Sequence, residues 1–125
     1  MVRATKTFGS FAVDDIEAAK RFYRGTLGLK VSVEAEGGPI WLHGSKGHDT
    51  LVYPKPDHVP ATFTVLNLFV DDLNATVDEL TAKGVHPERY DGIDTDDRGI
   101  LHAQGRSVAW FTDPAGNVVA VGQQQ

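Results

Sequence analysis

The sequence predicts an α+β fold in which one structural module occurs twice in tandem. Residues 11–18, FAVDDIEA, match residues 68–75, LFVDDLNA, at a constant offset of 57 residues. In both copies an apolar run leads into Asp-Asp and then into an apolar stripe with helical spacing. Several short apolar segments separated by turn residues follow in each copy, which is the pattern of strands. Two copies in 125 residues indicate one domain made of two halves.

Each module is expected to begin with a strand and a helix. The apolar runs at residues 5–13 and 62–70 predict the first strands. The Asp-Asp pairs that follow can cap the free N–H groups of a helix start. Gly28 and Gly84 are expected to end the helices in the left-handed conformation. The helix faces that should lie on a sheet consist of Ile16, Ala19, Phe22, Tyr23 and Leu27 in the first copy and Leu73, Val77 and Leu80 in the second.

Short strands are expected to complete each module. In the first module they are predicted at residues 30–35, 39–43 and 50–54. In the second they are predicted at residues 86–90, 100–103, 107–112 and 118–123, with a tight hairpin at residues 113–117. The proline-rich residues 54–60 read as a linker, and residues 91–99 as a mobile polar loop. The single domain 1–125 therefore divides into modules 1–57 and 61–125.

The composition excludes several classes of protein. The chain has 41% hydrophobic residues and no cysteine, so it can form a core but no disulfide or thiolate metal site. Its net charge of -5 argues against nucleic-acid binding, because phosphates need a basic surface. No apolar segment has a signal-peptide core or the length of a membrane span. We therefore expect a cytoplasmic protein that binds neither nucleic acid nor a membrane.

Two segments give a family resemblance that covers nearly the whole chain. The residues VDDI at 13–16, followed by Ala19, Phe22-Tyr23 and Leu27-Gly28-Leu29, resemble the opening of a vicinal oxygen chelate module. The residues WFTDPAGN at 110–117 resemble its closing hairpin. The resemblance to this glyoxalase, bleomycin-resistance and extradiol-dioxygenase superfamily implies two βαβββ modules whose mixed sheets curve into an open cup. It also implies a homodimer.

The superfamily's chemistry uses a divalent metal that holds two neighbouring substrate oxygens. The resemblance assigns its ligand positions here to Phe8, Val65, Ala120 and either Leu51 or Tyr53. None of these is an expected ligand of zinc, nickel, manganese or iron. The sequence therefore predicts no metal at these positions and no cofactor, although a site formed by other residues, such as His43 with His102, stays open.

Aromatic residues are concentrated where the cup is expected. Small-molecule sites are concave and mostly apolar, with few polar groups. Trp41 and Trp110 occupy corresponding predicted strands, and the indole N–H of tryptophan suits a pocket wall. The predicted ligand-binding residues are Phe8, Trp41, His43, Tyr53, Phe63, His102 and Trp110.

These observations support a metal-independent protein that binds a small apolar or aromatic ligand. An alternative is a vicinal oxygen chelate enzyme, such as a lyase, dioxygenase or isomerase, with displaced metal ligands or none. A third hypothesis is an accessory module without a ligand. No catalytic residue can be assigned from the sequence, since it contains no cysteine and no nucleophile motif.

Overall fold

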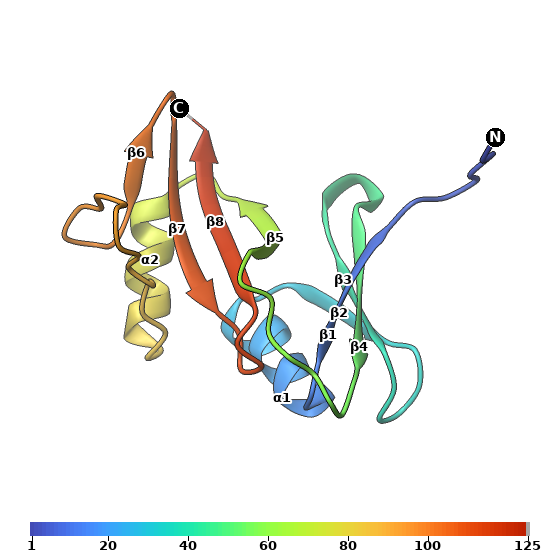
Figure 1. Cartoon of the computed structure of the whole chain (residues 1–125). Coiled ribbons are helices and arrows are strands. Elements are labelled where there is room, and N and C mark those ends of the chain that lie inside the picture. The colour runs from blue at the N-terminus through green and yellow to red at the C-terminus, as the bar shows by residue number, and fades with distance from the viewer. Residues whose placement is uncertain (125) are drawn as a thin grey trace. The chain divides into compact units, whose positions relative to one another are not determined.

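The computed structural model describes residues 1–124 and confirms two tandem βαβββ modules. The chain divides into two compact units, Met1–Val59 and the segment from Pro60 onward. Each unit contains a mixed four-stranded sheet (Figure 1). No helix within these residues is long and apolar enough to cross a membrane.

The first unit consists of β1 (Gly9–Val13), α1 (Ile16–Lys20), β2 (Lys30–Val33), β3 (Ile40–His43) and β4 (Asp49–Pro54). The strand order is β1-β4-β3-β2, with β1 parallel to β4 and the other neighbours antiparallel. A 3-10 turn, Ser45–Gly47, joins β3 to β4.

The second unit repeats this arrangement. It consists of β5 (Thr64–Phe69), α2 (Leu73–Ala82), β6 (Leu101–Ala103), β7 (Arg106–Thr112) and β8 (Val118–Gln124). The strand order β5-β8-β7-β6 is the same, with β5 parallel to β8. Trp41 on β3 and Trp110 on β7 therefore lie on corresponding strands, as the sequence predicts.

Both helices begin at the second aspartate of an Asp-Asp pair. The side chain of Asp15 accepts a hydrogen bond from the backbone N–H of Ala18 at 3.1 Å. Asp72 accepts one from Ala75 at 3.0 Å. These bonds satisfy N–H groups that have no partner within the helix, so the predicted capping is confirmed and assigned to one residue of each pair.

The first helix continues as a π-helix, Arg21–Thr26, which the periodicity did not predict. The backbone N–H of Leu27 bonds to the carbonyl of Phe22, five residues earlier. Phe22 and Tyr23 are both buried in this wider turn, and the Tyr23 ring meets Phe11 of β1 at 5.9 Å. The turn therefore lets two consecutive aromatic residues join the core.

One face of each sheet is buried against its helix. In the first unit this core contains Phe11, Val13, Ile16, Ala19, Phe22, Tyr23, Ile40, Leu42 and Val52. In the second unit α2 packs on β7 and β8, and the core contains Leu73, Val77, Leu80, Ile100, Ala109, Phe111, Val119 and Val121. Because side chains alternate along a strand, the strand residues that alternate with these core positions lie on the opposite, open face of each sheet.

The predicted strand at residues 86–90 is wrong. Only an isolated bridge forms there, between Glu88 and Trp110. Pro87 lacks the N–H that a ladder needs, which explains why the pairing stops at one bridge. The polar segment that follows is held by hydrogen bonds, because Arg89 donates to Thr95 and to the backbone carbonyls of Asp96 and Asp97.

Candidate functional site

The open face of the first sheet gathers four of the seven residues predicted from the sequence. Phe8 lies directly before β1, Trp41 and His43 lie on β3, and Tyr53 lies on β4. The registers Ser32↔Trp41 and Trp41↔Leu51 place these strands side by side. Since Ile40, Leu42 and Val52 alternate with these residues and are buried, the candidate residues share the face away from α1.

An aromatic pair forms one part of this face. The rings of Phe8 and Trp41 meet edge to face, with centroids 4.8 Å apart. Phe8 is 45% exposed and Tyr53 is 37% exposed, which is unusual for large apolar side chains on a sheet. The Trp41 Nε1–H donates to Glu34 Oε1 at 3.1 Å, so the polar edge of the indole is satisfied and its faces remain apolar.

A chain of polar side chains lies beside the aromatic pair. Ser32 Oγ is 2.7 Å from His43 Nε2, and His43 Nδ1 is 3.2 Å from Asp49 Oδ1. The two contacts involve different ring nitrogens, so Asp49 orients the imidazole and Ser32 lies at its other nitrogen. His43 and Asp49 are partly exposed, with 29% and 22% of their side-chain surfaces accessible.

The open face of the second sheet is separately hollowed. A cavity of about 180 Å³ lies over β5, β7 and β8 and is lined by Asn67, Leu68, Phe69, Arg106, Val108, Trp110, Ala120 and Gly122. Trp110 contacts Tyr90 edge to face at 5.9 Å. Desolvation raises the pKa of Tyr90, and the carboxylate of Glu88 adds to this shift, so the phenol stays neutral at physiological pH.

Two predicted site residues lie elsewhere. His102 pairs in register with Ser107, whose side chain faces the buried side of the second sheet. Its Nδ1 is 2.9 Å from Ser107 Oγ, and its Nε2 is 2.8 Å from Asp96 Oδ2. Phe63 precedes β5 and is 68% exposed. The structure therefore does not bring His102 onto the open face beside Trp110.

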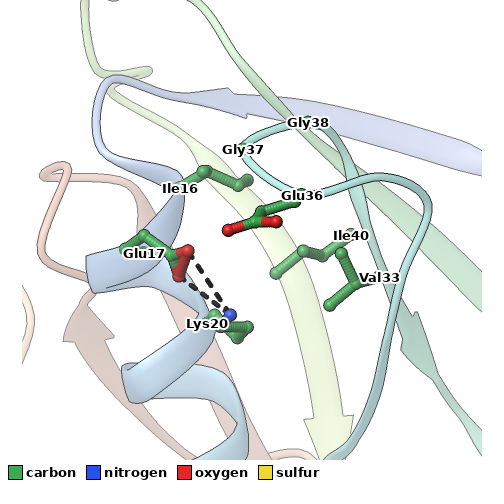
Figure 2. Close-up of a pocket in the computed structure, with 8 residues that line it drawn as sticks. All are labelled: Ile16, Glu17, Lys20, Val33, Glu36, Gly37, Gly38 and Ile40. Carbon is green, nitrogen blue, oxygen red and sulfur yellow. Dashed lines mark hydrogen bonds and ion pairs between the residues drawn. The ribbon is translucent and has the colours of Figure 1, made fainter.

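A smaller hollow of about 110 Å³ lies in the first unit. Figure 2 shows its lining residues, which come from α1, from β2 and β3, and from the turn that joins these two strands. Ile16, Val33 and Ile40 form its apolar part. Lys20 and Glu17 form an ion pair at 2.9 Å within it. It lies on the helix side of the sheet, so it is separate from the aromatic pair.

Four polar residues of the first open face were not predicted as site residues from the sequence, namely Ser32, Glu34, Asp49 and Lys6. Ser32 and Glu34 reach His43 and Trp41 only because the β2–β3 register brings them there. Lys6 lies over the aromatic pair from the segment before β1. The two hairpin contacts could have been found by pairing residues 30–33 with residues 40–43, whereas nothing in the sequence indicates the position of Lys6.

The sequence matches a protein-family model over both units. The model described as Glyoxalase/Bleomycin resistance protein/Dioxygenase superfamily matches residues 7–121. The chain belongs to this superfamily. No curated protein matches the chain. The match covers both modules, in agreement with the resemblance found in the sequence.

Solved structures of this superfamily have the same fold. A putative glyoxalase family protein from Bacillus anthracis aligns with a TM-score of 0.72 and 16% identity over 100% of both chains. Lactoylglutathione lyase from Agrobacterium tumefaciens aligns with a TM-score of 0.67 and 20% identity over 97% of this chain and 95% of its own. TnmS3, an antibiotic binding protein from Streptomyces sp. CB03234, aligns with a TM-score of 0.67 and 25% identity over 99% of this chain and 100% of its own.

The residues present do not fit the divalent metal that the superfamily implies. Phe8, Val65 and Ala120 have no metal-binding atom in their side chains, and Leu51 has none either. Within residues 1–124 there is no group of three or more His, Asp or Glu side chains that could hold a metal ion. His43 and Asp49 provide two donors on the first face, whereas a zinc site needs at least three protein ligands.

Proposed function

We propose that this glyoxalase-superfamily protein binds a small apolar or aromatic molecule on the open face of its first sheet, without a bound metal. The observation that carries the proposal is the aromatic pair of exposed Phe8 and half-buried Trp41 on the open face of a sheet where Phe8 itself occupies an expected metal-ligand position. The likeness to TnmS3 supports it, because that protein is an antibiotic binding protein. The ligand class of this chain is proposed from its own side chains.

The arrangement of the face suits a flat ligand. Phe8 and Trp41 meet edge to face with an angle of 70° between their planes, so a ring can stack on one and meet the edge of the other. Leu51 and Tyr53 extend the apolar surface along β4. His43 and Ser32 supply polar groups at its border, which can orient a ligand hydroxyl or carbonyl. Trp110 offers a separate apolar surface on the second sheet.

A titration with 4-tert-butylphenol, a neutral aromatic probe, tests the proposal. The chain has two tryptophans, so the two indole N–H signals in a ¹⁵N–¹H spectrum can be assigned with Trp110→Phe. We expect a saturable shift of the Trp41 signal with a dissociation constant in about the millimolar range, as for a small fragment. Phe8→Ala should weaken binding, while Val59→Ala, at an exposed residue between β4 and β5, serves as a control. No shift of Trp41 at any probe concentration would refute the proposal.

A second candidate function is a superfamily enzyme, such as an isomerase or lyase, that works without the usual metal ligands. It is favoured by the chain of contacts Ser32–His43–Asp49. Asp49 contacts Nδ1 and orients the imidazole, so that Nε2 is directed at the hydroxyl of Ser32 on the open face. A positioned histidine of this kind can remove or donate a proton at a bound ligand.

Paired histidine variants test this candidate. Any turnover found should fall by about 10²–10⁴-fold in His43→Ala, the range for loss of a general acid or base. It should be unchanged in His102→Ala, since His102 lies on the other side of the second sheet. Equal rates for wild type and His43→Ala would exclude this role for His43.

The proposal includes a homodimer. Phe63 and Phe69 leave large apolar surfaces exposed in the second unit, which is a feature of surfaces that associate. Sedimentation velocity at several concentrations should therefore give a dimer mass. A monomer mass at every concentration up to that of the binding experiments would contradict it. The cytoplasmic location and the lack of nucleic-acid binding stay predictions from the sequence.

A further inference from the structure

Lys6 places its ammonium group over the aromatic pair of the first sheet. Its Nζ lies 5.3 Å from the centroid of the Trp41 ring and 5.7 Å from that of Phe8. Both distances are within the range in which a cation is attracted by the negative face of an aromatic ring. The two rings meet at 70°, so one cation can contact both. The rings of Phe8 and Trp41 thus form two sides of one site, and the positive charge of Lys6 lies in that site in this structure.

Glu34 strengthens the electrostatic attraction of a cation to the Trp41 ring. Its Oε1 accepts the Trp41 Nε1–H at 3.1 Å, so a carboxylate lies at the edge of the indole. A negative charge there makes the potential over the indole more negative and favours a cation on its face. The net charge of -5 also favours the approach of a cation to the protein.

The contacts of Lys6 with the two rings are weak enough for a ligand to replace the lysine side chain. Lys6 is exposed and belongs to the irregular segment before β1. Within residues 1–124 no carboxylate forms an ion pair with it, so its charge is held by the rings alone. An exposed cation–π contact is a small interaction, comparable with the thermal energy.

We propose that Phe8, Trp41 and Glu34 form a seat for the organic ammonium group of a ligand, and that Lys6 occupies this seat while the ligand is absent. This inference rests on the proposed function, because it specifies the ligand class of the same face as an aromatic or apolar cation. It also gives the N-terminal segment a role, since Lys6 competes with the ligand.

Two probes of the same shape test the seat. The cation 4-hydroxy-N,N,N-trimethylanilinium and the neutral 4-tert-butylphenol differ mainly in charge. We expect the Trp41 indole signal to report binding of the cation about two- to five-fold tighter than that of the neutral probe, the range of an exposed cation–π contact. Glu34→Gln should lower this ratio, because the negative charge beside Trp41 is removed while both rings remain, and should leave the affinity for the neutral probe unchanged. Phe8→Leu should lower the ratio in the same direction, and Phe8 is too exposed for this change to unfold the sheet.

Lys6→Met tests the competition. The variant keeps the apolar stem and removes the charge, so the cation should bind about two- to five-fold tighter than to wild type. Lys55→Met is the matched control, because it removes the same charge from the same unit, where Lys55 pairs with Asp57. It should leave the affinity unchanged. An affinity of Lys6→Met equal to or weaker than that of wild type would overturn the proposed role of Lys6.

The outcomes separate this inference from the proposed function. Equal binding of both probes, with no effect of Glu34→Gln, would overturn the cation seat and leave apolar ligand binding intact. Failure of both probes to shift the Trp41 signal, in wild type and in Lys6→Met, would overturn the proposed function and the inference together.

Discussion

Asp113 holds the hairpin between β7 and β8 with a buried carboxylate. Its Oδ1 accepts from the backbone N–H groups of Ala115 at 3.0 Å and Asn117 at 2.8 Å, and its Oδ2 accepts from Asn117 Nδ2 at 3.2 Å. Gly116 takes the left-handed conformation that the turn needs, with φ of 84°. The sequence predicted this turn correctly, because Asp-Pro-Ala-Gly-Asn specifies it locally.

Asp113→Ala should lower the free energy of unfolding by about 1–3 kcal/mol, because it leaves buried N–H groups without their acceptor. Urea unfolding followed by circular dichroism measures the change. Asp57→Ala, which removes an exposed carboxylate, is the control and should have little effect. Equal losses in the two variants would show that the Asp113 hydrogen bonds add nothing.

The ionisation of Asp96 is expected to make the free energy of unfolding fall at acid pH. Desolvation acts to raise the pKa of Asp96, but hydrogen bonds from His102 and from the backbone N–H groups of Ile100 and Arg98 outweigh it and hold the pKa below 3.8. A carboxyl group whose pKa is lowered by folding stabilises the fold above its unfolded pKa, and this contribution is lost as pH falls through the folded pKa.

The difference in unfolding free energy between wild type and Asp96→Asn should therefore shrink as the pH falls below about 4. Urea unfolding at a series of pH values measures it. A difference that stays unchanged down to pH 2 would contradict the assignment of the lowered pKa to Asp96.

The candidate residues were predicted unevenly from the sequence. The sequence predicts Trp41 and His43 as ligand-binding residues of one strand, and the structure places both on the open face of the first sheet. The contacts of Ser32 and Glu34 on that face depend on the hairpin register, which local sequence does not determine. His102 was predicted as a ligand-binding residue, but the β6–β7 register pairs it with Ser107 on the helix side of the second sheet.

The secondary-structure elements follow local rules where those rules are strong. The repeated Asp-Asp pairs predicted both helix starts, and the positive φ of Gly28 and Gly84 fits the predicted helix ends. The π-helix at Arg21–Thr26 was not predicted, because it results from burying Phe22 and Tyr23 together against the sheet. The segment at residues 86–90 was predicted as a strand, but Pro87 has no N–H for a ladder and only the bridge between Glu88 and Trp110 forms.

The two aspartates before α2 allow a matched test of capping. Asp72 accepts the Ala75 N–H, so Asp72→Ala should lower the free energy of unfolding by about 1 kcal/mol. Asp71→Ala removes the same charge at the neighbouring position and should cost less, because only the interaction with the helix dipole changes. Thermal or urea unfolding of both variants measures the difference. A larger loss in Asp71→Ala would contradict the assignment of the cap.

The architecture of the whole molecule follows from the sequence repeat, whereas the side chains on each sheet's open face do not follow from it. The two sheets have the same strand order, yet their open faces differ. The first carries Phe8, Trp41 and the Ser32–His43–Asp49 chain, and the second carries the hollow beside Trp110. One fold supports many functions, so membership of the superfamily alone does not assign a function to either face.

The affinity for 4-tert-butylphenol, measured at the Trp41 indole with and without metal, tests whether the first sheet binds its ligand independently of metal. We expect the same saturable shift and the same dissociation constant in the presence of a chelator and in the presence of Zn²⁺, Ni²⁺ or Mn²⁺. Binding that appears only when one equivalent of metal is added, or that leaves the Trp41 signal unmoved, would contradict it.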